Sequence, residues 1–207
     1  YYGNKKNRYG VIYSDLEVRR NINKYPKIKR YLDKFKDIIT SDFAPYGLHR
    51  AREQHFFEGE KIMSLRKTPR PSFTYTDFPC YVSQTFFIIQ PRDINLKYLT
   101  AILNSRVVAF WLEQKGKKQG DLLQIDKEPL MNLPLIKTQD QKVSDKIIAL
   151  MEIMMDLSEK IQGARGSEKE HIQDQLEKTD REIDNLVYQL YGITEREKKI
   201  IEGECKE

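Results

Sequence analysis

The chain has 207 residues, of which 39% are hydrophobic and 32% are charged, and its formal net charge is +5. This composition is typical of a folded globular protein and excludes disordered and fibrous chains. No apolar run approaches the roughly 18 residues that span a membrane, so we expect no membrane-spanning segment. Because Cys80 and Cys205 fit no disulfide or zinc spacing, we expect a cytoplasmic protein without a bound metal.

The first 40 residues are strongly basic, with 11 Lys and Arg against 4 Asp and Glu. They contain a strand candidate at residues 9–13 and a basic helix candidate at residues 27–39. Residues 41–137 hold a further excess of four positive charges, whereas residues 138–207 hold an excess of six negative charges. The basic part predicts a polyanionic partner, above all nucleic acid, although a solvated lysine-rich surface would give the same count.

The middle segment alternates short strand candidates with prolines. Residues 61–66, 72–75 and 81–90 are rich in aromatic and β-branched residues and lie between prolines, as strands joined by turns do. In residues 95–113, apolar residues recur at helical spacing, which predicts one amphipathic helix. We therefore expect this segment to be α+β.

Two long helices are predicted in the acidic last third. Mostly apolar residues recur at spacings of 3 and 4 in residues 143–161 and again in residues 172–190, as in helices that pack against each other. The linker between them has glycines that suit a helix end and Ser167 that suits an N-cap. After Gly192, Thr194 and Glu197 have the spacing of a capping box that would open a short last helix. We predict an α+β fold: a small mixed-sheet domain over residues 1–137, then an antiparallel helical hairpin and a short last helix over residues 138–207. The hairpin could be a spacer or added core.

Catalytic motifs are missing from the sequence. There is no Gly-rich phosphate loop and no Gly-x-Ser-x-Gly turn, and the three histidines are not spaced to bind a metal together. A hydrolase could be built from Asp93, Glu113 and Lys115, since two carboxylates and a lysine can hold a divalent ion, but such triplets are common in charged chains. We therefore predict no catalytic residue and no metal site in this stretch.

Several runs of residues resemble one known family. Their order along the chain is similar to that of the TaqI-like C-terminal specificity domain of adenine-specific DNA methyltransferases, and they lie at residues 25–35, 46–52, 56–62, 99–105 and 133–135. The resemblance covers roughly residues 10–137. It implies a target recognition domain, which reads the DNA site for a restriction-modification enzyme.

The same resemblance implies a methyltransferase domain upstream, with an Asn-Pro-Pro-Tyr-type motif and a site for S-adenosylmethionine. Neither motif occurs here, so we expect no cofactor in this stretch. Because the chain begins at Tyr1 rather than Met, we expect it to be part of a longer bacterial protein, an adenine methyltransferase or a combined methyltransferase-endonuclease of type IIG. The alternative is a non-catalytic subunit, similar to type I specificity subunits, whose hairpin docks separate methyltransferase and nuclease chains.

Two loops are the main candidates for contact with double-stranded DNA. In residues 66–71, prolines stiffen a loop whose arginines could reach a guanine edge. In residues 114–120, lysines suit phosphates, glutamines suit an adenine edge and glycines allow close approach of the backbone. The first loop could also be an ordinary solvated turn, and Arg50 could equally form a structural salt bridge. The candidate DNA-binding residues are His49, Arg50, Arg52, Arg66, Lys67, Arg70, Gln114, Lys115, Lys117, Lys118 and Gln119.

Overall fold

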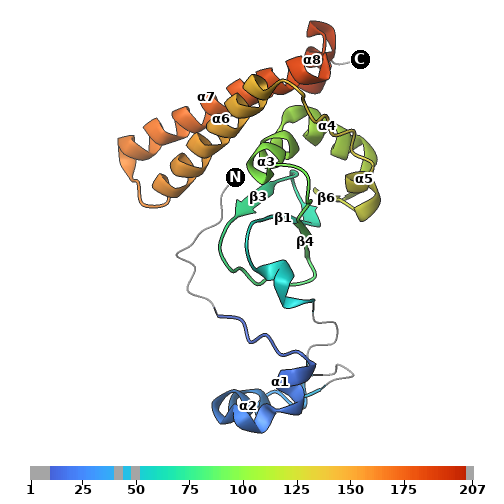
Figure 1. Ribbon diagram of the computed structural model, residues 1–207, viewed down its shortest axis with the longest axis vertical. Coiled ribbons are helices and arrows are strands. Elements are labelled where there is room, and N and C mark those ends of the chain that lie inside the picture. The colour runs from blue at the N-terminus through green and yellow to red at the C-terminus, as the bar shows by residue number, and fades with distance from the viewer. Residues whose placement is uncertain (1–9, 40–43, 48–51, 204–207) are drawn as a thin grey trace. The chain divides into compact units, whose positions relative to one another are not determined.

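The computed structural model describes residues 10–39, 44–47 and 52–203, which form helices and two small antiparallel sheets (Figure 1). The fold is α+β, as predicted. Contacts divide the chain into two compact units: an N-terminal unit, Lys6–Phe57, and a main unit that contains Glu58–Glu207. The domain boundary expected at residue 137 stays a prediction.

The N-terminal unit consists of short helices. Asp15 begins the first of them by accepting a hydrogen bond from the backbone N–H of Val18, and a proline opens α2 with its φ angle already suited to a helix. Residues 10–13 form no strand, so this part of the candidate at residues 9–13 was wrong. The elements are α1 (Leu16–Arg20), η1 (Ile22–Lys24), α2 (Pro26–Asp33) and η2 (Gln54–Phe57).

The first sheet of the main unit has β1 (Lys61–Leu65) at its centre, between β3 (Phe73–Thr76) and β4 (Phe86–Ile89). Both pairings are antiparallel, and the opposed residues Ile62 and Tyr75 are almost fully buried. The strand predicted at residues 81–90 is shorter because the backbone N–H of Phe86 bonds back to the carbonyl of Ser83 in a turn.

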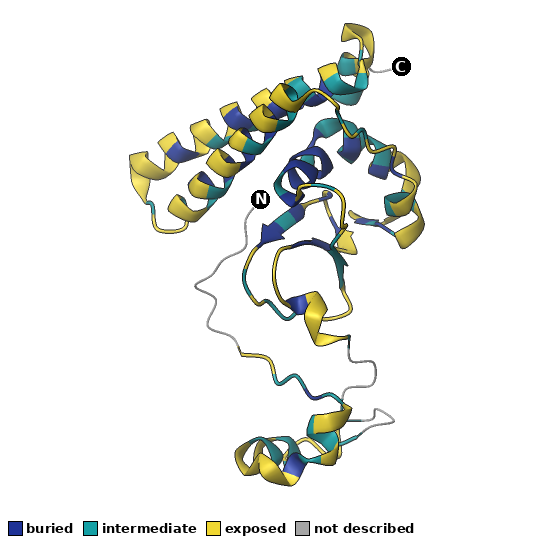
Figure 2. Cartoon of the chain, in the orientation of Figure 1, coloured by how far each residue is buried: buried dark blue, intermediate teal, exposed yellow. Residues whose placement is uncertain are grey.

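Helix α3 (Leu96–Asn104) lies between the first sheet and the long C-terminal helices (Figure 1). It begins at Asn95, whose side chain accepts hydrogen bonds from the backbone N–H groups of Lys97 and Tyr98. Seven of its nine residues are buried, so it is dark blue in Figure 2. The hydrophobic core of the main unit is therefore centred on this helix, which packs on β1 and β3 and also on α6 and α7.

The single helix predicted over residues 95–113 is two helices, α3 and α4 (Arg106–Lys115). Ser105 has an extended backbone between them, and its hydroxyl accepts a hydrogen bond from the backbone N–H of Val108. The carboxylate of Asp184 accepts a further bond from the backbone N–H of Arg106 at 2.8 Å. The prediction missed the break because the apolar spacing continues through a residue that caps a helix.

The two segments predicted as loops, residues 66–71 and 114–120, both contribute strands to a second sheet. Strands β5 and β6 form a hairpin whose turn begins at Gly120, with a φ angle of 60°, as a type II′ turn requires. Lysine is depleted in strands, so the residue types of β5 did not indicate one; β6 pairs with β5 across the turn and with β2, which is distant in the chain. In spatial order the strands are β2 (Lys67–Thr68), β6 (Leu122–Gln124) and β5 (Lys117–Gln119).

The remaining elements are helical. Helices α6 and α7 lie side by side, and Ile147, Met151 and Ile183 are buried where they meet the core (Figures 1 and 2). The capping box predicted at Thr194 and Glu197 is present and opens α8. No helix in the described part of the chain is long and apolar enough to cross a membrane. The bounds are α5 (Lys127–Met131), α6 (Gln141–Lys160), α7 (Gly166–Tyr191) and α8 (Glu195–Ile201).

Candidate nucleic-acid interface

The second sheet presents a polar face to solvent. Lys67 on β2 lies opposite Gln124 on β6, which in turn lies opposite Lys117 on β5. Opposed residues point to the same face of a sheet, so two lysines flank one glutamine in a row across three strands. Gln119 and Leu122 form the neighbouring pair on that face. We call the surface of Lys67, Lys117, Gln119, Leu122 and Gln124 the outer face.

The opposite face anchors the second sheet to the main core. Thr68 and Leu123 are opposed on this face, and both are buried. Lys118 lies opposite Leu123 on the other side, so it belongs to the inner row although it is exposed at the sheet edge. Because alternate residues of β5 point to opposite faces, Lys117 and Lys118 occupy different surfaces.

The carboxylate of Asp126 organises the polar groups of the outer face. It accepts a hydrogen bond from the side-chain amide of Gln124 at 2.8 Å, and it pairs with the Lys117 ammonium at 3.3 Å. The guanidinium of Arg66 lies 4.0 Å from the same carboxylate. The hydrogen bonds from Gln124 and Lys117 lower the pKa of Asp126, so this group remains ionised at neutral pH.

A hollow of about 350 Å³, lined by charged residues and by Trp111, lies beside the outer face. The Lys115 ammonium lies 5.4 Å from the centre of the Trp111 ring, and the Trp111 indole N–H donates to the carbonyl of Pro129 at 3.5 Å. Both side chains line the hollow together with Lys117 and Asp126. The predicted residues Lys115 and Lys117 are therefore brought together around one hollow, with an aromatic ring at its wall.

The two arginines of the first predicted loop have different surroundings. Arg66 stacks on Phe87, with 5.2 Å from the guanidinium carbon to the ring centre, and its backbone carbonyl accepts from the N–H of Ile125. Arg70 is exposed, and its backbone carbonyl accepts from the Thr68 hydroxyl at 2.7 Å. Arg66 is thus held beside the outer face, whereas Arg70 lies in the segment beyond β2.

Arg70 also acts on a buried carboxylate of α7. Burial raises the pKa of Asp184, while the backbone N–H and the guanidinium of Arg106, and the charge of Arg70, lower it. The Arg106 guanidinium lies 3.2 Å from the Asp184 carboxylate. Arg106 is therefore the direct partner of Asp184, and Arg70 contributes only a favourable charge.

The other predicted residues are not part of the outer face. Gln114 is exposed at the end of α4, before the hairpin of β5 and β6. Arg52 belongs to the N-terminal unit, where its backbone carbonyl accepts a hydrogen bond from the Tyr13 hydroxyl. His49 and Arg50 lie outside the described residues. Their proposed contact with DNA stays a prediction.

Sequence reasoning missed Gln124 and Asp126, although both are central to the outer face. A signal was present: Gly120-Asp121 is a turn sequence, and an alternating strand pattern would then place residue 124 on the same face as residue 122. The run from 122 to 126 was too short to be read as a strand by itself. Its assignment depends on β2, which is more than 50 residues earlier in the chain.

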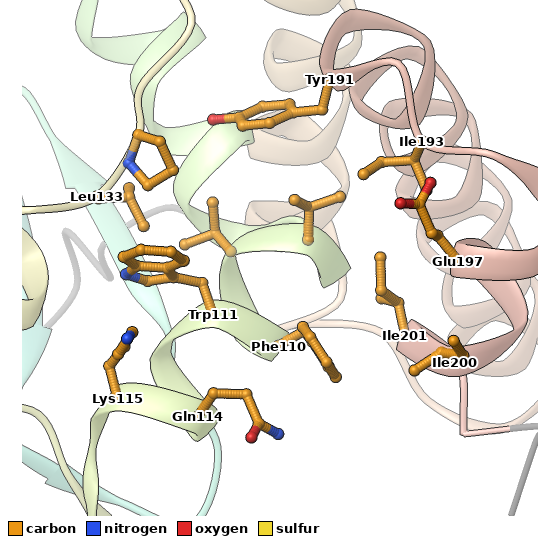
Figure 3. A pocket seen from close by; sticks show the side chains of 13 residues that line it. Phe110, Trp111, Gln114, Lys115, Leu133, Tyr191, Ile193, Glu197, Ile200 and Ile201 are labelled. Carbon is orange, nitrogen blue, oxygen red and sulfur yellow. The ribbon is translucent and has the colours of Figure 1, made fainter. Parts of the chain in front are cut away.

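A second, apolar pocket lies between α4 and α8 (Figure 3). Its volume is about 460 Å³, and its wall is formed largely by Phe110, Trp111, Ile193 and Ile200, as the close view shows. Gln114, Lys115 and Glu197 contribute the polar groups. The wall suits an apolar group better than a phosphate, so we place the nucleic-acid candidate on the outer face instead.

A hydrolytic centre at Asp93 and Glu113 has no support in the described residues. Asp93 precedes α3, where its backbone carbonyl accepts from the Lys137 ammonium at 2.8 Å, and Glu113 is exposed on α4. Among the residues that the structure describes, no three His, Cys, Asp or Glu side chains are grouped so that they could hold a metal ion.

Comparisons with known proteins agree on one family. Residues 12–135 match the model of the TaqI-like C-terminal specificity domain. Two similar curated proteins are the Type II methyltransferase M.HindII of Haemophilus influenzae strain KW20 / Rd and the Type II methyltransferase M.HincII of Haemophilus influenzae. Each is 24% identical to this chain over an alignment of 158 residues, and the match covers 68% of this chain and 30% or 31% of the relative. The chain thus spans about a third of the length of these relatives.

Proposed function

Because this chain belongs to the family of TaqI-like C-terminal specificity domains, we propose that it recognises a sequence in double-stranded DNA through the outer face of its second sheet. The observation that carries the proposal is the row formed by Lys67, Gln124 and Lys117. Neighbouring strands are about 4.8 Å apart, so the two lysines are separated by roughly 10 Å at the backbone. That width suits the major groove, about 12 Å across, which admits a β-ribbon.

The lysines and the glutamine would have different tasks in the groove. Lys67 and Lys117 would pair with phosphates, which gives affinity and register but no sequence information. Gln124 donates one amide N–H to Asp126, and the other N–H and the carbonyl oxygen remain for a base. One donor and one acceptor on a glutamine amide match the N7 and N6 groups of adenine in the major groove. Asp126 would therefore be a positioning residue for base recognition.

The arginines of the first predicted loop, residues 66–71, would add further DNA contacts beside the outer face. Arg66 lies beside Asp126, so a guanine next to the adenine would meet a guanidinium that stacking on Phe87 already orients. Arg70 and Gln119 would contact bases or phosphates farther along the duplex, and Gln114, Lys115 and Lys118 would contact its backbone. His49, Arg50 and Arg52 remain proposed contacts from the N-terminal unit.

The longer protein would be a restriction-modification enzyme of the bacterial cytoplasm. Both relatives are named Type II methyltransferases, and this chain matches about a third of their length. We propose that the rest of the parent protein carries the methyltransferase domain, with S-adenosylmethionine bound there, and that it methylates an adenine, either alone or together with an endonuclease. The alternative, a type I-like subunit that docks separate enzymes, predicts no Asn-Pro-Pro-Tyr motif in the same reading frame upstream.

Binding to DNA tests the proposal directly. In the full 207-residue chain, a Lys67→Ala and Lys117→Ala double variant should bind a random-sequence duplex at least tenfold more weakly in fluorescence anisotropy. The slope of log affinity against log salt should fall by about 1.8, because two phosphate contacts are lost. Lys142→Ala and Lys146→Ala on the exposed side of α6 provide a control with the same charge change, and should bind as the unaltered chain does. Equal affinity of the two double variants would disprove the assignment.

Base recognition needs a separate measurement. When the Gln124→Ala variant selects duplexes from a randomised pool, the selected site should have lost its base preference at one position. The affinity for the original site should change by less than tenfold. A good bidentate contact discriminates between bases by about 1 to 3 kcal/mol, so the preference at that position should fall by roughly 5- to 150-fold. Lys118→Ala, from the inner row of β5, should keep the full preference. An unchanged site for Gln124→Ala would exclude this glutamine as the reader.

A further inference from the structure

Helix α2 of the N-terminal unit carries a cationic surface that the fold does not use. Lys27, Arg30 and Lys34 are spaced by 3 and 4 residues, so they lie on one side of the helix. All three side chains are exposed, and none of them forms an ion pair or a hydrogen bond with another described residue. Tyr31 lies on the same side and is 51% exposed. We call the surface of Lys27, Arg30, Tyr31 and Lys34 the α2 face.

The acidic residue of α2 does not weaken the charge of this face. Asp33 lies about one turn from Arg30, but its carboxylate pairs with Lys29 at 3.0 Å and accepts a hydrogen bond from the Tyr46 hydroxyl at 2.5 Å. The bonds from Tyr46 and Lys29 lower the pKa of Asp33, and the bond to Asp33 raises the pKa of Lys29, so both stay charged. Their charges cancel, and within the described residues the three cations of the α2 face are left without an acidic partner.

Aromatic side chains accompany the cations. The rings of Tyr31 and Phe35 are packed edge to face, with 5.3 Å between their centres, yet Phe35 is still 38% exposed and Tyr25 is 43% exposed. Exposed aromatic rings are unusual on a helix that only needs to be solvated, because a soluble surface gains nothing from them. A tyrosine hydroxyl can donate to a phosphate oxygen, as the neighbouring ammonium and guanidinium groups can.

We propose that the α2 face binds the sugar-phosphate backbone of double-stranded DNA, as a contact separate from the outer face of the second sheet. This inference rests on the proposed function. Lys27 and Lys34 are separated by seven residues, or about 10 Å along a helix. One DNA strand advances about 3.4 Å along the duplex axis per phosphate, so this span faces roughly three phosphates of a single strand, which the long side chains can reach. The contact adds affinity and leaves the choice of sequence to the main unit.

The test is a salt titration of the full chain. A triple variant, Lys27→Ala, Arg30→Ala and Lys34→Ala, should keep the helix because alanine favours it, and circular dichroism checks this. Its slope of log affinity against log salt should be smaller by about 2.7, which is three phosphate contacts, and its affinity at 100 mM salt should be at least tenfold weaker. Its selected site should be the same as that of the unaltered chain.

A matched control separates the α2 face from a general effect of charge. Lys142→Ala, Lys146→Ala and Lys169→Ala remove the same charge from exposed positions of α6 and α7, and should leave the slope unchanged. If the α2 triple variant keeps the original slope while the Lys67 and Lys117 double variant loses affinity, this inference is wrong and the proposed function stands. If the unaltered chain fails to bind duplex DNA, both are wrong. An acidic protein as the true partner of the α2 face would give the first of these results.

Discussion

At the scale of single residues, the run at residues 99–105 is explained by two polar side chains. The Asn104 amide donates to the carbonyl of Phe73 and accepts from its N–H, at 2.8 and 2.9 Å, so it acts as a partner for the edge strand β3. Ser105 ends α3 and caps α4. The part of the family resemblance that lies on α3 is therefore structural: it joins the first sheet to the helix that precedes the outer face.

The half-buried acid Asp180 on α7 predicts how stability changes with pH. Burial and the negative charge of Asp184 raise the pKa of Asp180 to about 6, from 3.8 in the unfolded chain. Between pH 4 and 6 the folded chain binds more protons at Asp180 than the unfolded chain does. The contribution of Asp180 to the free energy of unfolding therefore falls as pH rises from 4 to 6, and it is constant above pH 6.

The variant Asp180→Asn should thus be more stable than the unaltered chain at pH 7.5, by about 1 to 3 kcal/mol, and the gain should shrink toward zero as pH falls to 4. Urea unfolding at several pH values measures this difference. Asp174→Asn removes an exposed carboxylate from the same helix and should show no such pH-dependent gain. A gain for Asp180→Asn that is the same at pH 4 and 7.5 would contradict the linkage.

At the scale of elements, the outer face depends on the contact between the end of α4 and strand β6. Gly116 ends α4, and its backbone N–H donates to the carbonyl of Leu112 at 2.7 Å. A Cβ atom at this position would lie 2.6 Å from a methyl group of Leu123 and 2.8 Å from the carbonyl oxygen of Leu112. The backbone of Leu112 on one side and the side chain of Leu123 on the other leave no space for a side chain at this position. Glycine is therefore required where the chain turns from α4 into β5.

Gly116→Ala should therefore lower the free energy of unfolding by about 1 to 3 kcal/mol, the usual effect of overpacking, and should weaken DNA binding because β5 shifts. Gly163→Ala is the matched control, since the nearest atom to its Cβ would be 4.0 Å away. Urea unfolding of both variants measures the effect. If Gly116→Ala were as stable as Gly163→Ala, the close packing of α4 on β6 would be disproved.

At the scale of the whole molecule, the core belongs to the main unit alone. Its hydrophobic cluster contains residues from Ile62 to Tyr191 and none from the N-terminal unit. In that unit the buried residues, among those described, are Ser14, Ile22 and Phe57. Burial of apolar surface is the main favourable term in folding, so the main unit should be stable by itself, and the N-terminal unit should contribute little to its stability.

A shortened chain of residues 58–207 should fold and unfold cooperatively, with a urea midpoint close to that of the main transition of residues 1–207. Circular dichroism and tryptophan fluorescence from Trp111, the single tryptophan, follow the main unit in both proteins. The shortened chain would also lack the α2 face and should therefore bind DNA with a smaller salt dependence. Loss of a cooperative transition would show that the N-terminal unit is required for the core.

Much of this protein was predictable from local sequence. Short-range patterns predicted the two long helices, the capping box at Thr194 and the α+β class. They also predicted the strands at residues 61–66 and 72–75. Such patterns are informative because periodicity and caps depend on neighbours in the chain. The family was also identified from runs of residues.

The tertiary structure decided the rest. Residues 66–71 and 114–120 read as two separate loops, since strands of two or three polar residues carry no pattern of their own. They form one sheet only because β6 pairs with both, and that pairing then places Gln124 between two lysines and beside Asp126. A strand acquires its role from its partner, and partners that are distant in the chain are set by packing rather than by local sequence.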